Sequence, residues 1–282
     1  MSLAELNTTG YQFLRDYISE QTGIELGPDR QYLVQSRLEP LMSQNGFRSL
    51  ADLCSAIIQE NVQSRRQPGQ SPPLKRKLIH ALTTHETSFF RDPDCFHLLK
   101  SSILPALIAS NGPGRLRIWS AAASSGQEPY SLAILCAEMG ISPPPSILAS
   151  DVSSIVLEIA TAGTYTDYEL LRGFEDATLR EKYLIPIIGG AQIAAPIRQT
   201  VEFRWADLRD DSVDLGPFDM VLCRNVLIYF DELTRSAVLS HLVKQLRPGG
   251  VLVLGAAEAI WTQLPGLRRV ESDYFTYYEK VN

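Results

Sequence analysis

Apolar residues recur at helical spacing along the N-terminal part of the chain. The spacing predicts helices over residues 10–22, 29–45, 49–60 and 74–82. A polar stretch rich in proline and glycine, residues 62–73, separates the third of these helices from the fourth and indicates a linker. We therefore expect an all-α N-terminal domain over residues 1–75, with the linker included.

The pattern changes in the rest of the chain, where short apolar runs alternate with helical segments. Runs typical of buried strands occupy residues 116–119, 146–151, 218–222 and 251–255. Helical spacing predicts a helix over 93–109, one after Gly126, and others over 153–162, 176–183 and 231–246. This alternation is typical of a parallel sheet with helices on both faces, so residues 76–282 are predicted to form a Rossmann-like α/β domain. Residues 274–278 are expected to close its sheet as an edge hairpin.

One segment of the predicted α/β domain has a different character. Residues 184–204 contain isolated apolar residues around a Gly189-Gly190 pair, which is typical of short strands joined by a tight turn. We expect a small antiparallel β insertion there.

Composition narrows the class of protein. The chain has 282 residues and a net charge of −6, which disfavours a general nucleic-acid binder. No apolar run is long enough to cross a bilayer, and residues 1–10 lack the pattern of a signal peptide. The four cysteines are scattered, which predicts reduced thiols in a cytoplasmic protein and no metal site.

The stretch Leu116–Ala133, LRIWSAAASSGQEPYSLA, joins a strand to a helix through a turn of small residues. Such a turn opens the first unit of a nucleotide-binding sheet. Glu128 follows Gly126 at the start of the helix and would repel a pyrophosphate, whereas a cationic ligand would be attracted. Asp151 ends the next strand, 25 residues after Gly126, where an acid is placed to bind ribose hydroxyls. Together these residues favour S-adenosylmethionine (SAM) over NAD. Asp151 could instead cap the following helix.

Four segments resemble one family when taken in order. THETSFFRD (residues 84–92), AAASSGQEPYSLA, the ASD of the second strand, and FDMVLCRNVLIYFD closely resemble the chemotaxis receptor methyltransferases called CheR. The resemblance implies a methyltransferase sheet with an all-α N-terminal domain and a β insertion. It also implies transfer of a methyl group from SAM to glutamate side chains of chemoreceptor helices, with S-adenosylhomocysteine as product.

The resemblance also implies roles for individual residues. Those expected to contact the cofactor are His85, Thr87 and Arg91 at its methionine portion, Glu128 at its amino-acid portion, Asp151 at the ribose, Asp207 and Leu208 at the adenine, and Arg224 and Asn225 beside it. Tyr229 matches a tyrosine near the transferred methyl group. The chain departs from the common family pattern at His85 and Asp207, where Asn is frequent, and at Ala256-Ala257, where His-Ser is frequent.

The expected chemistry needs few catalytic groups. A glutamate carboxylate, with a reference pKa of about 4.3, is already ionised at neutral pH, so its attack on the SAM methyl group needs no general base. Catalysis is then alignment, and we expect Arg91 and Tyr229 to position the carboxylate or the cofactor.

Several alternatives remain open at this stage. The fold could bind SAM or its product as a regulatory module without transfer. A nucleic-acid methyltransferase is disfavoured by the net charge and by Arg224-Asn225-Val226-Leu227 where such enzymes have an Asn/Asp-Pro-Pro-Tyr motif. The expected partners are chemoreceptor cytoplasmic helices, and a receptor C-terminal tail at the insertion, with no nucleic acid and no membrane insertion. Arg30 and Arg37 could dock a receptor or form a solvated face, and Phe89 and Phe90 could be core residues.

Overall fold

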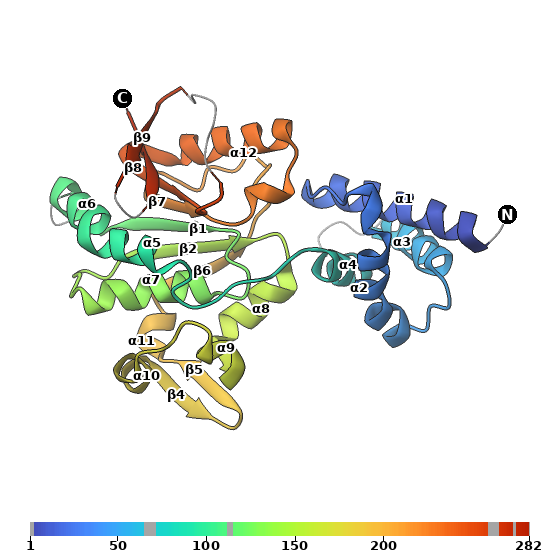
Figure 1. Ribbon diagram of the computed structural model, residues 1–282, viewed down its shortest axis with the longest axis horizontal. Helices are drawn as coiled ribbons and strands as arrows, with labels where there is room; N and C mark the ends of the chain where they lie inside the picture. The colour runs from blue at the N-terminus through green and yellow to red at the C-terminus, as the bar shows by residue number, and fades with distance from the viewer. Residues whose placement is uncertain (1–2, 65–71, 112–114, 259–264, 273–274, 282) are drawn as a thin grey trace. The chain divides into compact units, whose positions relative to one another are not determined.

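The computed structural model describes residues 3–64, 72–111, 115–258, 265–272 and 275–281, which form two compact units (Figure 1). The helical unit extends to Thr84, and the α/β unit begins at His85. Residues 153–155 and 229–231 group with the helical unit. No helix of the described ranges is long and apolar enough to span a membrane.

The helical unit contains every helix predicted for it. Its elements are α1 (Leu3–Thr22), η1 (Pro28–Arg30), α2 (Gln31–Gln44), α3 (Leu50–Ser64) and α4 (Pro73–Leu82). The end of α3 covers residues 62–64 of the predicted linker, and residues 65–71 lie outside the described ranges. The unit extends past the expected boundary at residue 75 because α4 packs against α1, α2 and α3 and buries Leu78, Ile79 and Leu82.

Arg37 has a structural role inside this unit. Its guanidinium donates to the carbonyl oxygens of Leu82 and Thr83, each at 3.3 Å, and to the Thr84 hydroxyl at 3.3 Å. A cation at the C-terminus of a helix satisfies carbonyls that have no intrahelical partner. Arg37 therefore caps α4 and is not simply part of a solvated face, whereas Arg30 is exposed.

The α/β unit is built on a seven-stranded sheet in the order β6-β2-β1-β7-β8-β10-β9. Its strands are β1 (Arg117–Ala121), β2 (Ser146–Asp151), β6 (Val201–Trp205), β7 (Phe218–Cys223), β8 (Leu246–Leu254), β9 (Leu267–Glu271) and β10 (Thr276–Lys280). The strands from β6 to β8 are parallel, and β10 is antiparallel to both β8 and β9. The predicted Rossmann-like sheet is confirmed, with β9 at its edge; Tyr274 of the predicted hairpin lies outside the described ranges.

Helices cover both faces of this sheet (Figure 1). On one face, Ile118 of β1 belongs to an apolar cluster with Leu132 of α7 (Gln127–Glu138). The next residue, Trp119, points to the other face, where its ring lies 6.1 Å from that of His241 in α12 (Glu232–Gln245). Because successive residues face opposite sides, burial of both faces requires the continuous apolar runs seen in the sequence.

The predicted helix over residues 93–109 is present but changes its winding. It consists of α5 (Pro93–Leu98), the π-helical segment η2 (Leu99–Ile103) and α6 (Leu104–Asn111). The backbone N–H of Leu104 donates to the carbonyl of Leu99, five residues earlier. Pro105 follows directly and has no N–H, and its ring would crowd the carbonyl four residues before it, so a widened turn accommodates it.

The antiparallel insertion is present but its predicted range, residues 184–204, is wrong. The second sheet has the order β3-β5-β4, from β3 (Thr164–Thr166), β4 (Leu184–Ile187) and β5 (Gly190–Ile193). Helix α8 (Ser154–Ala162) directly precedes β3 in the chain. Helices α9 (Asp167–Leu171) and α10 (Ala177–Tyr183) connect β3 to β4. After β5, α11 (Ala195–Arg198) redirects the chain, and β6 pairs in parallel with β2 of the large sheet. Phe203 of β6 packs against Tyr130 of α7, with ring centroids 5.5 Å apart, which places this strand in the main core.

Candidate functional site

Three neighbouring parallel strands end at the same edge of the large sheet. The last residue of β1, Ala121, pairs in register with Ser150, the residue before the end of β2, and with Cys223, the last residue of β7. Ligands of open α/β sheets bind outside this carboxyl edge. The turns that follow β1, β2 and β7 therefore form the candidate site, together with residues 85–92, which we call the entry loop.

The backbone at this edge is held in an uncommon conformation. Five described residues other than glycine have positive φ, between +48° and +61°: Phe90, Asp92, Ala122, Ser124 and Asn225. All five lie in the entry loop or in the turns after β1 and β7. Such backbone costs about 1–3 kcal/mol per residue and clusters at functional sites, because the surrounding contacts must hold it.

The turn after β1 is hydrogen-bonded to the end of β2 and to the entry loop. The backbone N–H of Ser124 donates to Oδ2 of Asp151 at 2.9 Å, and its hydroxyl donates to the carbonyl of His85 at 3.0 Å. Asp151 is 8% exposed. Gly126 has φ +95°, and a Cβ there would lie 2.9 Å from Cβ of Ala160 and 3.0 Å from the Tyr165 hydroxyl oxygen. The chain needs glycine here for its backbone angle and for close packing.

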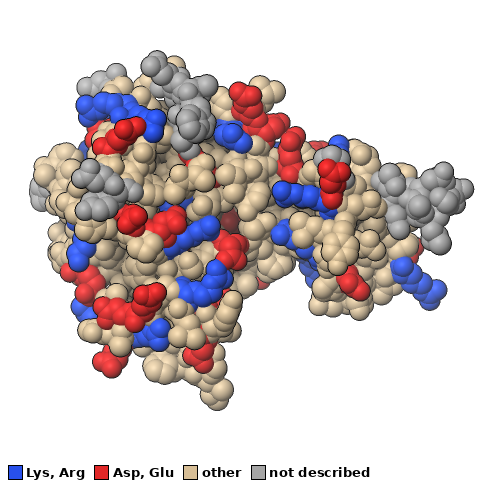
Figure 2. Space-filling model, in the orientation of Figure 1, with Lys and Arg blue, Asp and Glu red and all other residues tan. Residues whose placement is uncertain are grey.

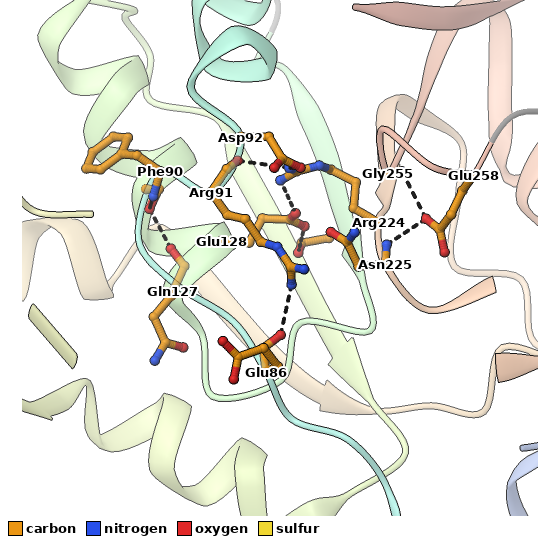
Figure 3. Close-up of polar contacts among 12 residues, drawn as sticks. Glu86, Phe90, Arg91, Asp92, Gln127, Glu128, Arg224, Asn225, Gly255 and Glu258 are labelled. Carbon is orange, nitrogen blue, oxygen red and sulfur yellow. Dashed lines mark hydrogen bonds and ion pairs between the residues drawn. The ribbon is translucent and has the colours of Figure 1, made fainter. Parts of the chain in front are cut away.

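A buried arginine joins the entry loop to α7 (Figure 3). The Arg224 side chain is 1% exposed; one terminal nitrogen lies 2.9 Å from Oε2 of Glu128 and the other 2.6 Å from Oδ2 of Asp92. The second nitrogen also donates to the carbonyl of Arg91 at 2.8 Å. Glu128 accepts a further hydrogen bond at Oε1 from the Ser120 hydroxyl, at 2.7 Å.

These charges keep Arg224 protonated. Burial is the largest single influence and lowers its pKa, but Glu128 and Asp92 raise it, and the net pKa is above the ordinary value. Burial raises the pKa of the nearby Cys95 thiol to about 12. Burial also raises the pKa of the Cys223 thiol, directly before Arg224. Neither thiol supplies a nucleophilic thiolate at neutral pH.

The entry loop brings three predicted site residues to this edge. His85, Thr87 and Arg91 are each half-buried. Arg91 donates from one guanidinium nitrogen to the carbonyl of Glu86 at 2.9 Å. Phe89 is 1% exposed and packs edge-on against two aromatic rings, so it is a core residue.

Asp207 and Leu208 follow β6, the neighbour of β2, and so lie at the same edge. Leu208 is buried. Oδ1 of Asp207 accepts from the backbone N–H of Arg209 at 2.9 Å, and Oδ2 lies 2.6 Å from a guanidinium nitrogen of Arg209. The aspartate that replaces the common asparagine is thus engaged by a cation of its own loop.

Tyr229 does not group with the other predicted site residues. It ends η3 (Leu227–Tyr229) and belongs to the helical unit, where its carbonyl accepts from the backbone N–H of Glu25 at 3.0 Å. Its catalytic role remains a prediction.

Sequence reasoning missed four residues that organise this edge: Ser120, Ser124, Asp92 and Glu258. Glu258 accepts from the backbone N–H of Asn225 at 2.6 Å. Asp92 stands directly before Pro93, which indicates a helix start, but nothing local links it to Arg224, 132 residues later. Ser120 lies in β1 and Ser124 in the turn that follows, within a run of small residues in which small size alone would explain both serines.

The composition of this edge suits SAM. Glu128, Asp151 and Asp207 bring three carboxylates to it, and carboxylates can bind both an ammonium group and the hydroxyls of a ribose. Within the described ranges, no group of three or more His, Cys, Asp or Glu side chains is arranged to hold a metal ion.

Comparisons with known proteins agree with this geometry. Residues 85–275 match the SAM binding domain of the CheR methyltransferases, and residues 9–83 match the all-alpha domain of the same family. The chain is 40% identical to chemotaxis protein methyltransferase 1 of Pseudomonas aeruginosa, over 89% of this chain and 90% of that protein. It is 36% identical to a chemotaxis protein methyltransferase of Vibrio parahaemolyticus, over 92% of each. It is also 36% identical to the probable biofilm formation methyltransferase WspC of Pseudomonas aeruginosa, over 84% of this chain and 60% of that protein.

The site, the sheet order and both domain matches lead to one conclusion. The chain belongs to the CheR methyltransferase family and carries its SAM-binding domain.

Proposed function

We propose that this protein transfers a methyl group from SAM to glutamate side chains of chemoreceptors, forming a methyl ester and S-adenosylhomocysteine. The observation that carries the proposal is the meeting of Glu128, Asp151 and Arg224 at one sheet edge in a chain of this family. Modification of receptor cytoplasmic helices would place the enzyme in the cytoplasm.

SAM supplies an electrophilic methyl carbon on a sulfonium, which leaves as a neutral thioether. The attacking glutamate is already ionised at neutral pH, so the protein needs to bind, orient and exclude water. Two well-oriented reactants gain up to about 7–11 kcal/mol relative to free encounter. This is consistent with an edge that offers ion pairs and rigid turns.

We infer different roles for the two arginines, Arg224 and Arg91, from their contacts. Arg224 is fully enclosed by protein partners, so we assign it the task of orienting Glu128 toward the cofactor. The Arg91 guanidinium donates a hydrogen bond to the Glu86 carbonyl oxygen. A guanidinium has five N–H donors, which leaves Arg91 able to bind the cofactor carboxylate or the incoming glutamate.

We infer that a receptor tail would bind at the antiparallel insertion. Three isoleucines are exposed: Ile185 (49%) and Ile187 (45%) in β4, and Ile188 (105%) directly after it. Among the described strands, β4 pairs with β5 alone and forms one edge of the three-stranded sheet. An extended peptide could add as a fourth strand there, with apolar side chains against the isoleucines.

Nucleic acid is not the proposed substrate. Figure 2 shows Lys and Arg interspersed with Asp and Glu on the face in view, without a continuous basic field among its described residues. The net charge of −6 points the same way.

The alternative is a SAM-binding regulatory module without transfer activity. The ion pair between Asp207 and Arg209 supports it, because a carboxylate engaged by a cation is a weaker partner for the exocyclic amine of adenine. Altered adenine recognition would change affinity without removing the fold.

Transfer of a labelled methyl group to a receptor cytoplasmic fragment tests the proposal. Methyl esters release methanol in base, so we expect base-labile label on the fragment and none on a fragment whose modified glutamates are replaced by glutamine. Arg91→Ala should slow turnover, and Arg91→Lys should recover part of it. Binding of SAM without base-labile label would support the regulatory module and contradict the transferase.

A further inference from the structure

Glu258 lies at the same sheet edge, yet the expected chemistry does not use it. It follows β8, whose last residue, Leu254, pairs in parallel with Cys223 of β7. Arg224 and Asn225 come directly after Cys223. The turns after these two strands are therefore neighbours, and Figure 3 shows the Glu258 carboxylate pointing at the backbone of Asn225.

One carboxylate joins three backbone groups. Oε2 of Glu258 accepts from the N–H of Asn225 at 2.6 Å and from the N–H of Gly255 at 2.9 Å, and Oε1 accepts from the N–H of Ile228 at 3.3 Å. Glu258 is 6% exposed. These three backbone donors compensate the buried carboxylate.

Gly255 leaves the space for this arrangement. A Cβ at Gly255 would lie 2.6 Å from Oε2 of Glu258, 2.9 Å from the backbone nitrogen of Asn225 and 3.0 Å from its side-chain nitrogen. Real Cβ atoms do not approach other atoms so closely. Glycine at 255 and glutamate at 258 thus form one unit that fixes the Asn225 turn.

That turn needs support, because Asn225 has φ +59°. Left-handed backbone of a non-glycine residue persists only where its surroundings determine it. The hydrogen bond from the Asn225 N–H to a charged acceptor is the direct restraint on this residue, and charge-assisted hydrogen bonds are the stronger ones.

We propose that Glu258 is a positioning residue for SAM binding, which acts by holding the Asn225 turn in its binding conformation. This inference rests on the proposed function, since it assumes that Asn225 lies beside SAM. Without the carboxylate, the turn would populate other backbone conformations, and the binding-competent fraction would fall. Apparent affinity falls in proportion to that fraction.

The test compares Glu258→Gln, Glu258→Ala and Gly255→Ala with the wild-type chain. Glu258→Gln keeps one oxygen that can accept from Asn225 and Gly255, whereas Glu258→Ala keeps none. We expect the Kd for SAM and for S-adenosylhomocysteine, measured by calorimetry well below each melting temperature, to rise in the order wild type, Gln, Ala. The Ala variant should lose at least about tenfold, and Gly255→Ala should behave like Glu258→Gln.

A matched control is Glu271→Gln on β9, where the side chain is 70% exposed and pairs with Arg269. It should leave both Kd values unchanged. A positioning role also predicts a higher KM for SAM with the KM for the receptor fragment unchanged, a split that a general loss of stability would not produce.

Wild-type affinity in a folded Glu258→Ala would overturn the inference. Should that variant not fold, Glu258→Gln and Gly255→Ala decide, and Kd values within twofold of wild type in both would overturn it. Absence of SAM binding by the wild-type chain would contradict the proposed function instead.

Discussion

Replacing Arg224 by methionine should destabilise the α/β unit strongly. Methionine has a similar length but no charge, so it would leave Glu128 and Asp92 facing each other without their shared cation. The side chain of Glu128 is 13% exposed and that of Asp92 is 35% exposed. Water would therefore compensate Asp92 in large part and Glu128 hardly at all.

Removing one partner of a buried ion pair costs about 3–5 kcal/mol. Because Asp92 is partly solvated, we expect the lower end, about 3 kcal/mol. A domain of 150–250 residues loses about 2–4 °C of melting temperature per kcal/mol, which corresponds to roughly 6–12 °C.

Scanning calorimetry and near-UV circular dichroism would measure this change. Arg204→Met is the matched control: Arg204 pairs with Glu202, their side chains are 49% and 64% exposed, and its loss should stay within about 0.5 kcal/mol. Adding Glu128→Gln to Arg224→Met should recover part of the stability, because the unpaired buried charge is removed. A loss of less than about 1 kcal/mol in the free energy of unfolding of Arg224→Met would refute the conclusion that Arg224 stabilises this edge by pairing with Glu128 and Asp92.

Two further predictions concern stability. His241 is 3% exposed, and burial lowers its pKa, although the negative charge of Asp211 raises it. The folded state therefore favours the neutral ring. The free energy of unfolding should fall as the pH drops below about 6.5, the pKa of histidine in the unfolded chain. His241→Phe should flatten that part of the pH profile, and an unchanged slope would contradict the reasoning. Gly126→Ala should cost about 1–3 kcal/mol more than Gly189→Ala, since both have positive φ but a Cβ at 189 meets nothing within 4 Å. Equal losses in denaturant titrations of the two variants would show that packing at Gly126 is not the cause.

Hydrophobic patterning was sufficient for most of the fold because the buried strands and amphipathic helices are strongly periodic. It did not predict that β6 belongs to the large sheet, because the alternation of Val201 and Phe203 fits a strand of the insertion equally well. Which strand becomes the partner depends on α11, whose turn returns the chain to β2. The π-helical turn before Pro105 could have been anticipated only from the proline itself.

The candidate site was predictable where a residue ends a strand. Asp151 and Arg224 follow buried runs, and parallel strands bring such ends to one edge. The contacts of Arg224 with Asp92, and of Glu258 with Asn225, join residues distant in sequence and depend on tertiary packing. No local pattern marks them.

The central claim is that the carboxyl edge of this sheet binds SAM. Calorimetry of the wild-type chain with SAM and S-adenosylhomocysteine should show binding of both, with one site per chain. Asp151→Ala should weaken both by tenfold or more, and Asp211→Ala, which alters an aspartate whose side chain is 68% exposed, should not. No binding by the wild-type chain, or equal affinity in Asp151→Ala, would contradict the account.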